Sequence, residues 1–324
     1  METVYGHRNL LQSLTEAVKE RRLSHAYILE GPAGVGKHTV ARWLAGMMMC
    51  RCGGNCGQCD ECRQVEAASH PDVVVAKQEY FQNDKIKAGS VEAMRLLRQE
   101  AYTKPFLGEK KLYVIPQADQ MLAPAQNSLL KILEEPPEYC VFLLLCENAE
   151  KLLETVRSRS VLLRLQPLQE EEMISFLCTR YGEETARRLL RPSQGLPGRA
   201  IQMAEDPGFL QRREQAVRLF CAFLQTGDLF PLSAFLEKER DFWEEILDGL
   251  SDVTAEAAAL YCVQEAASPE AVQLAACFDV RSLTEVFFQL QKGVEKLQAN
   301  ANYSLTVTEL LMKCGQLGKG EVHD

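Results

Sequence analysis

The segment Gly31-Pro-Ala-Gly-Val-Gly-Lys37 limits the folds open to this chain more than any other feature. It follows an apolar run at 26–29 and precedes a helical pattern at 39–49, which is the strand, loop and helix order of a phosphate-binding loop. In such a loop backbone N–H groups curl around phosphate oxygens, the helix N-terminus adds positive potential, and a lysine supplies a point charge. The sequence therefore predicts a phosphate site at Gly31, Gly34, Gly36 and Lys37. The alternative is a glycine-rich turn without a ligand.

Short apolar runs alternate with helical patterns through the first half of the chain, which predicts a parallel α/β sheet. The runs are apolar on consecutive residues, as expected for strands that helices cover on both faces. One helix should carry Val91, Met94, Leu97 and Ala101 on a single face, and another should stop before Pro136-Pro137. The expected strands are 26–29, 73–76, 112–115, 141–145 and 161–165.

The strand signal disappears after Pro167, and the remaining sequence is helical in pattern. A small set of helices over 169–203 ends in the turn Gly195-Leu-Pro-Gly198. We therefore predict three domains: a P-loop domain at 1–166 with an inserted module at 50–62, a helical lid at 167–205, and an all-helical domain at 206–324.

The residues expected to handle Mg²⁺ at the phosphate loop are missing. Ser or Thr should follow Lys37, but His38 stands there, and Thr39 comes one position too late because consecutive helical residues point about 100° apart. A later strand should end in an acidic pair, but it runs into Pro116-Gln117. Asp119 lies beyond the strand tip, and we interpret it as a solvated turn residue. The sequence thus predicts weak or absent ATP or ADP binding and no efficient hydrolysis.

Five cysteines are concentrated in residues 50–62, including Cys56-x2-Cys59-x2-Cys62. In a reducing compartment such spacing indicates a metal more often than a disulfide, and four thiolates suit a tetrahedral structural Zn²⁺. The favoured ligands are Cys50, Cys56, Cys59 and Cys62, with Cys52 as an alternative to Cys50. An iron–sulfur cluster is the rival, although no Cys-Pro follows. The other seven cysteines are interpreted as small core residues.

The composition excludes some classes of protein. With 36 Lys and Arg against 45 Asp and Glu, the formal charge of −9 creates no overall basic field, so any DNA contact must be local or shared with partners. No apolar run is long enough to span a membrane, and the N-terminus METVYGHRNL lacks a signal-peptide pattern. We therefore expect a cytoplasmic protein without a membrane partner.

Several of these motifs coincide in one family. The segment Leu23-Ser-His-Ala-Tyr27, the cysteine module, His70-Pro-Asp72, the run from Asn127 to Pro137 and Ser158-Arg-Ser160 together resemble the delta-prime and gamma/tau subunits of the bacterial DNA polymerase III clamp loader. The resemblance is strong over about the first 200 residues, and Asn300-Ala-Asn302 adds a weaker match. It implies an AAA+ ATPase domain with a five-stranded sheet, a three-helix lid and a helical collar.

The resemblance also implies roles for single residues. Arg159 aligns with the arginine finger of the family's Ser-Arg-Cys motif, which reaches the ATP of the neighbouring subunit, and Ser160 replaces the usual cysteine. Taken alone, Arg159 is equally an ordinary ion-pair residue, and Arg157 is close enough to be confused with it. Arg199 matches the sensor arginine of the lid, and Cys146 or Glu147 occupies the place of the polar sensor residue.

His38, Pro116 and Gln117 favour delta-prime over gamma/tau, and the printed sequence ends at Asp324 without the long extension that tau carries. The implied function is that of a clamp-loader subunit without intrinsic ATPase activity, with gamma/tau, delta, the sliding clamp and primer–template DNA as partners. Two alternatives remain: an active gamma-type ATPase that uses Thr39 and Asp119, and a zinc-bearing interaction module of another assembly that retains a vestigial P-loop.

Overall fold

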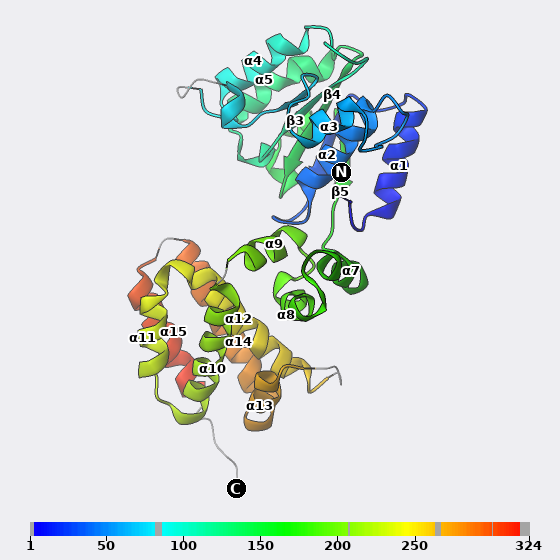
Figure 1. Cartoon of the computed structure of the whole chain (residues 1–324). Coiled ribbons are helices and arrows are strands. Elements are labelled where there is room, and N and C mark those ends of the chain that lie inside the picture. The colour runs from blue at the N-terminus through cyan, green and yellow to red at the C-terminus, as the bar shows by residue number, and fades with distance from the viewer. Residues whose placement is uncertain (1–2, 82–85, 207, 263–266, 300, 318–324) are drawn as a thin grey trace. The chain divides into compact units, whose positions relative to one another are not determined.

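The computed structural model describes residues 3–81, 86–206, 208–262, 267–299 and 301–317. The chain divides into two compact units, Met1–Ile201 and Gln202–Asp324. The first unit contains the whole sheet and the first lid helices, and the second is helical (Figure 1). The predicted domain boundaries at 166/167 and 205/206 stay predictions.

The first unit is built on five parallel strands in the order β2-β3-β4-β1-β5. Strand β1 lies between β4 and β5, with Ala26 opposite Phe142 and Tyr27 opposite Val161. This confirms the parallel five-stranded sheet, and each expected strand is present within one or two residues of its predicted bounds. The strands are β1 (Ala26–Glu30), β2 (Val73–Val75), β3 (Lys111–Ile115), β4 (Cys140–Cys146) and β5 (Val161–Arg164).

Helices cover both faces of the sheet at its central strands (Figure 1). Alternate residues of the central strands point into two separate cores: Ile28 and Tyr113 pack with the helices α4 and α5, whereas Leu29 and Leu112 pack with α1 and α2. The helices of this part are α1 (Arg8–Lys19), α2 (Lys37–Met49), α3 (Asp60–Glu66), α4 (Val91–Ala101), α5 (Ala123–Glu134) and α6 (Glu154–Arg157).

The ends of α4 and α5 follow local signals. Ser90 caps α4 by accepting the N–H of Ala93 with its side chain. Helix α5 ends at Glu134, and Glu135 leaves the helical conformation directly before Pro136, as predicted from the proline pair. Three helices follow the sheet in the region predicted to form the lid, and we refer to them by that name: α7 (Glu170–Tyr181), α8 (Glu183–Ser193) and α9 (Pro197–Glu205).

The second unit has a single apolar core in which the aromatic side chains of Phe220 and Phe223 and the buried face of α14 take part. Asn302 is exposed and is not part of that core. Its side-chain oxygen accepts the N–H of Leu305 at the start of α15. Asn300 lies outside the described residues. The helices are α10 (Phe209–Thr226), α11 (Phe230–Lys238), α12 (Trp243–Ala259), α13 (Pro269–Cys277), α14 (Val280–Gln298) and α15 (Tyr303–Leu317).

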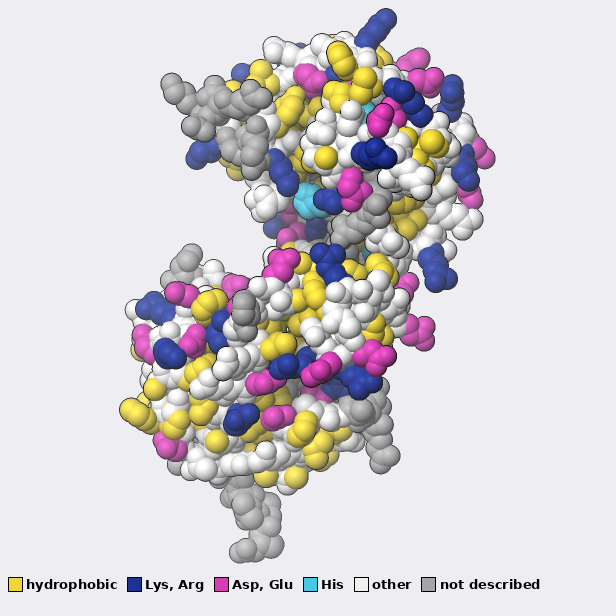
Figure 2. Space-filling view, viewed as in Figure 1, with side chains coloured by type: hydrophobic (Ala, Val, Ile, Leu, Met, Phe, Trp, Pro, Cys, Tyr) yellow, Lys and Arg dark blue, Asp and Glu magenta, His cyan; other side chains and the backbone are white. Residues whose placement is uncertain are grey.

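Two sequence expectations were wrong. Strand β5 is not covered on both faces, because it lies at the sheet edge and Val161 and Leu162 are exposed. Of the seven isolated cysteines, Cys262 and Cys277 are exposed and therefore are not core residues. Lys and Arg are scattered among Asp and Glu across the face shown in Figure 2, in keeping with the net charge. No helix within the described ranges is long and apolar enough to cross a bilayer.

Candidate nucleotide and metal sites

The phosphate loop joins β1 to the first turn of α2, as the sequence predicts. Gly36 precedes α2 with a φ of 103°, a left-handed conformation that is strained for residues with a side chain. Val35 anchors the loop because its side chain is buried in the core beneath α2. The N–H groups at the start of α2 thus lie at the carboxyl end of a central strand, which is where parallel sheets bind ligands.

The lid contacts this loop directly. The N–H of Gly198 donates to the carbonyl oxygen of Gly34 over 2.7 Å. A Cβ atom at Gly198 would lie 2.7 Å from the Cα of Gly34, so this approach requires glycine. Gly34 itself has a φ of 77°, in the left-handed region. The lid and the phosphate loop therefore meet backbone to backbone.

A cavity of about 210 Å³ lies beside the loop. Its walls come from the N-terminal segment at 3–7, the loop and first turn of α2, and the lid helices α7 and α9. Tyr5 meets Phe176 of α7 edge to face, with 5.3 Å between the ring centroids. The cavity is mainly apolar and adjoins the loop, as is typical of small-molecule sites, although its volume is below the roughly 300–1,000 Å³ of a typical ligand pocket. The N-terminal segment had no motif that predicted this position.

Lys37 turns back onto the loop. Its Nζ donates to the carbonyl oxygens of Gly31 at 2.5 Å and Pro32 at 2.9 Å. Desolvation lowers the pKa of Lys37, and the charge of Glu147, followed by Cys146 and Asp119, acts in the opposite direction. The ammonium group thus lies near the carboxyl ends of β3 and β4, where a bound phosphate is expected.

The first turn of α2 places His38 and Thr39 beside the cavity. Desolvation by burial, and then the charges of Lys77, Lys37 and Arg42, lower the pKa of His38 and so favour its neutral imidazole. A neutral imidazole is a poor ligand for Mg²⁺, which prefers oxygen atoms.

Asp119 lies half-buried in the 3₁₀ turn after β3, and its interpretation as a solvated turn residue stays a prediction. Its Oδ2 accepts the N–H groups of Glu147 and Asn148, each at 3.2 Å, and so joins the 3₁₀ turn after β3 to the end of β4. Pro116 and Gln117 occupy the turn where an acidic pair was expected. Among the described residues, no group of three or more Asp, Glu, His or Cys side chains converges at the phosphate loop.

The cysteine module connects α2 to α3. The Sγ atoms of Cys50, Cys52, Cys56 and Cys59 all lie within 4.8 Å of one another. Cys50 is 3.9 Å from Cys59 and Cys56 is 3.9 Å from Cys62, both measured between sulfurs. Sulfurs around a tetrahedral Zn²⁺ with bonds of 2.3 Å are about 3.8 Å apart. The module therefore brings all five predicted thiols together, and the choice between Cys50 and Cys52 stays open.

Backbone amides turn toward these sulfurs, as the C-x2-C spacing predicts. Cys56 accepts the N–H groups of Gln58 and Cys59, and Cys59 accepts that of Cys62. The two amides at Cys56 are the main reason that its pKa falls to about 6, which favours the thiolate that a metal binds. Cys62 is fully buried, and burial raises the pKa of its thiol to about 12.

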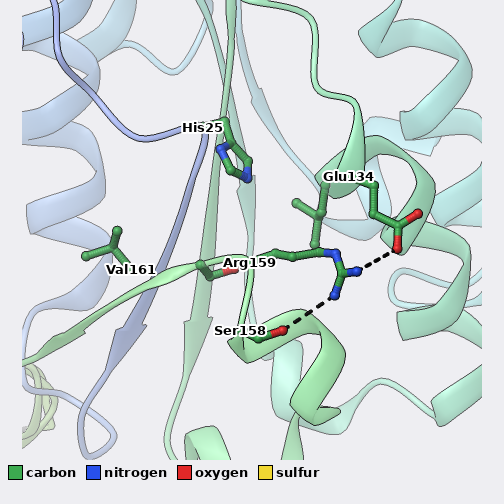
Figure 3. Close-up of a pocket in the computed structure, with 7 residues that line it drawn as sticks. His25, Glu134, Ser158, Arg159 and Val161 are labelled. Carbon is green, nitrogen blue, oxygen red and sulfur yellow. Dashed lines mark hydrogen bonds and ion pairs between the residues drawn. The ribbon is translucent and has the colours of Figure 1, made fainter.

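Arg159 is the second residue after α6 and lies beside an open hollow of about 540 Å³ that His25, Glu134 and Ser158 also line (Figure 3). Ser160 donates to the carbonyl oxygen of Val156, which holds this turn against α6. The guanidinium is partly exposed, and of its contacts Glu134 and Ser158 line the hollow, whereas Thr155 does not. Arg157 is exposed and does not line the hollow.

The backbone of Arg199 lies close to the phosphate loop. A Cβ atom added at Gly34 would be 3.0 Å from the backbone nitrogen of Arg199. Its side chain contacts Gln194, with 3.1 Å from Nη1 to Oε1. The sequence did not identify Glu134 or His25 as lining residues, although both lie within motifs that carried the family resemblance.

Comparison with known proteins places the chain in a family. A family model described as DNA polymerase III, delta subunit, matches residues 6–169, about half of the chain. The delta-prime subunit of DNA polymerase III from Bacillus subtilis (strain 168) is 34% identical over 214 residues, which cover 65% of this chain and 63% of that protein. The tau subunit from Escherichia coli (strain K12) is 34% identical over 173 residues, 52% of this chain and 26% of that protein.

The matched regions span less than two thirds of these relatives' own length. A solved structure of a gamma subunit-related protein from Thermotoga maritima covers 95% of this chain and 99% of its own, at 15% identity and a TM-score of 0.46. The match of the family model across the sheet domain identifies the chain as a member of the DNA polymerase III delta-subunit family, and the curated relatives confirm its resemblance to the delta-prime and gamma/tau subunits.

Proposed function

We propose that this chain is a delta-prime-type subunit of a DNA polymerase III clamp loader that does not hydrolyse ATP itself. In this proposal it assembles with gamma/tau and delta subunits in the cytoplasm, and the complex loads the sliding clamp onto primer–template DNA. The names of the curated relatives support membership of the polymerase complex. The remaining partners and the loading activity are part of the proposal.

The observation that carries the proposal is the chemistry around Lys37. A neutral imidazole, His38, stands where a hydroxyl would bind Mg²⁺, and Pro116 and Gln117 stand where carboxylates would. Asp119, which the active-ATPase alternative would use in their place, accepts two backbone N–H groups through its Oδ2. Phosphoryl transfer depends on a metal that neutralises charge on the phosphates, so this site lacks what hydrolysis requires. The loop and its cavity still suit a nucleotide that binds weakly.

Arg159 gives the chain a part in hydrolysis by another subunit. A guanidinium at the rim of an open hollow can reach a phosphate presented by a neighbouring protein, and it stays charged at any physiological pH. Arginine fingers supplied in this way raise the rate by about 10³ to 10⁵ at the site they serve. We therefore propose that Arg159 acts in trans on the ATP of an adjacent subunit.

The cysteine module is proposed to hold a structural Zn²⁺. The favoured ligands are Cys50, Cys56, Cys59 and Cys62; the sulfurs of Cys50 and Cys59, and those of Cys56 and Cys62, are each 3.9 Å apart, while the four that lie within 4.8 Å of one another include Cys52 in place of Cys62. Four thiolates around the metal would leave no position open for a substrate. Zn²⁺ bound there would fix the end of α2 to the start of α3. It would have no part in the chemistry of ATP.

The test is the ATP turnover of the complex reconstituted with gamma/tau and delta subunits. With Arg159→Ala, turnover should fall toward the level of a complex assembled without this chain, because the neighbour's transition state loses its guanidinium. Arg157→Ala is the matched control and should leave turnover unchanged. Normal turnover with Arg159→Ala would remove the finger assignment.

A second measurement separates this proposal from an active gamma-type ATPase. The purified chain alone should show no Mg²⁺-dependent hydrolysis above that of its Lys37→Ala variant. Rapid hydrolysis that Lys37→Ala abolishes would instead assign catalysis to this chain's own loop.

A further inference from the structure

Glu134 has a position that helix stability does not explain. It is the last residue of α5, where the unsatisfied carbonyl groups of a helix create negative potential. A carboxylate at this end is unfavourable, and the side chain of Glu134 is 47% exposed. Pro136 prevents α5 from extending further, so the position of Glu134 at the rim of the hollow is fixed by the backbone.

The partner of this carboxylate is Arg159. Glu134 Oε1 lies 2.9 Å from Arg159 Nη2, and both side chains line the same hollow (Figure 3). On its other side the guanidinium donates from Nη1 to the carbonyl oxygen of Thr155 at 2.9 Å, and Ser158 Oγ lies 3.4 Å away. The guanidinium plane is thus held from two elements, α5 and α6, which are distant in sequence.

These contacts hold the guanidinium without covering it. An arginine has five N–H donors, and the contacts with Glu134, Thr155 and Ser158 engage three of them. The side chain of Arg159 remains 35% exposed. A phosphate that enters the hollow can therefore be met by the remaining donors while the ion pair with Glu134 persists.

We propose that Glu134 is the positioning residue for Arg159, and that it orients the guanidinium for the nucleoside triphosphate of an adjacent subunit. This proposal rests on the proposed role of Arg159 in trans. An arginine side chain with no partner samples many rotamers, and a fixed carboxylate reduces the loss of entropy when the guanidinium binds the transferring phosphoryl group. Glu134 touches neither substrate nor metal in this scheme.

The expected effect is modest, because partly exposed ion pairs contribute little. Glu134→Gln should lower kcat of the reconstituted complex about three- to fivefold, which is what the loss of an exposed pair produces. The KM for ATP should stay unchanged, because the neighbour's own loop binds the nucleotide. Glu134→Asp keeps the charge and should recover part of kcat.

The experiment compares single and double variants in the complete complex. Glu135→Gln is the control, because it removes the adjacent exposed carboxylate, which does not line the hollow. Arg159→Ala combined with Glu134→Gln should be no slower than Arg159→Ala alone, because the carboxylate then has nothing to orient. Thermal unfolding and assembly of each variant should match those of the parent chain.

The outcomes distinguish the two proposals. A loss of turnover with Arg159→Ala but none with Glu134→Gln overturns the positioning role and leaves the finger in place. Faster turnover with Glu134→Gln also overturns it, because the carboxylate would then be masking the arginine. A double variant that is slower than either single one shows that Glu134 acts through some other group. Unchanged turnover with Arg159→Ala overturns both proposals together.

Discussion

The carbonyl oxygen of Gly34 in the phosphate loop accepts the N–H of Gly198, the second residue of the lid helix α9. A hydrogen bond of 2.7 Å between two glycine backbones leaves no room for a side chain at the contact. The lid is therefore joined to the loop by the peptide chain itself. The geometry of this contact depends on both residues remaining glycine.

Gly198→Ala should destabilise the first unit. The new Cβ atom would meet the Cα of Gly34 at 2.7 Å, so either the lid or the loop must shift. Forcing a methyl group into a packed contact costs about 1–3 kcal/mol, which chemical denaturation measures directly. Gly108→Ala is the control, because its Cβ would meet no atom closer than 3.9 Å and its free energy of unfolding should change by less than about 0.5 kcal/mol. Equal unfolding free energies for both variants would show that the backbone around Gly34 and Gly198 shifts to accept the methyl group without loss of stability.

Asp72 should make the free energy of unfolding depend on pH. Its buried carboxylate accepts the N–H groups of Phe106, Leu107 and Gly108 at 2.6–3.0 Å. Burial acts to raise the pKa of Asp72, but these three donors oppose it and the net pKa lies below the ordinary value of 3.8. A lowered pKa stabilises the folded state at neutral pH, and this contribution is lost as the pH falls below about 4.

The corresponding variant is Asp72→Asn. At pH 7 it should lose about 1–3 kcal/mol of unfolding free energy, because a charged acceptor becomes a neutral one with an additional donor. The difference from the parent chain should shrink as the pH drops below 4, where the parent's own carboxylate becomes protonated. Glu184→Gln, on an exposed surface of α8, should show no such convergence. If the difference in unfolding free energy between Asp72→Asn and the parent chain stays constant with pH, ionisation of the Asp72 carboxylate is not its cause.

The cysteine module should bind one Zn²⁺ per chain. Cys56→Ser or Cys62→Ser should reduce the metal content and lower the temperature of unfolding, because the closed site loses one of its four thiolates. Cys262→Ser changes an exposed cysteine of the second unit and is the matched control. The metal is measured by elemental analysis of the purified protein.

Cys52→Ser decides which cysteine is the fourth ligand. The exposed Cys52 should be dispensable if Cys50 binds the metal, so full zinc content is expected for Cys52→Ser and a reduced content for Cys50→Ser. The reverse result would exchange the two residues in the proposed site. Iron in place of zinc would favour the rival cluster.

Sequence patterns predicted the elements that depend on local rules. The five apolar runs became the five strands, and α5 ended before Pro136 because proline excludes the preceding residue from the helix. The prediction that helices cover both faces of β5 was wrong for a physical reason. An edge strand and a central strand can both be apolar in sequence. Only the order of the strands, which depends on long-range pairing, distinguishes them. The same limit applied to Cys262 and Cys277, whose exposure depends on tertiary packing.

The positions of the phosphate loop and of the C-x2-C cysteines could be predicted, because each is defined by residue types at a fixed spacing in the sequence. The site was not predictable where residues distant in sequence meet. The carboxylate of Asp119 accepts the N–H groups of Glu147 and Asn148, which follow it by 28 and 29 positions, and no sequence pattern near Asp119 indicates these hydrogen bonds. Glu134 and Arg159 likewise come from separate elements, and their pairing follows only from the packing of α5 against α6.

Helix α2 has the phosphate loop at one end and the cysteine module at the other. Its 13 residues form a helix about 20 Å long, so a group that fixes one end of the helix also restricts the movement of the other end. Loss of the proposed Zn²⁺ from the cysteine end should for this reason also alter the affinity for a nucleotide that binds at the opposite end. If the proposed Zn²⁺ site is confirmed, nucleotide affinities should be compared only between preparations with equal zinc content.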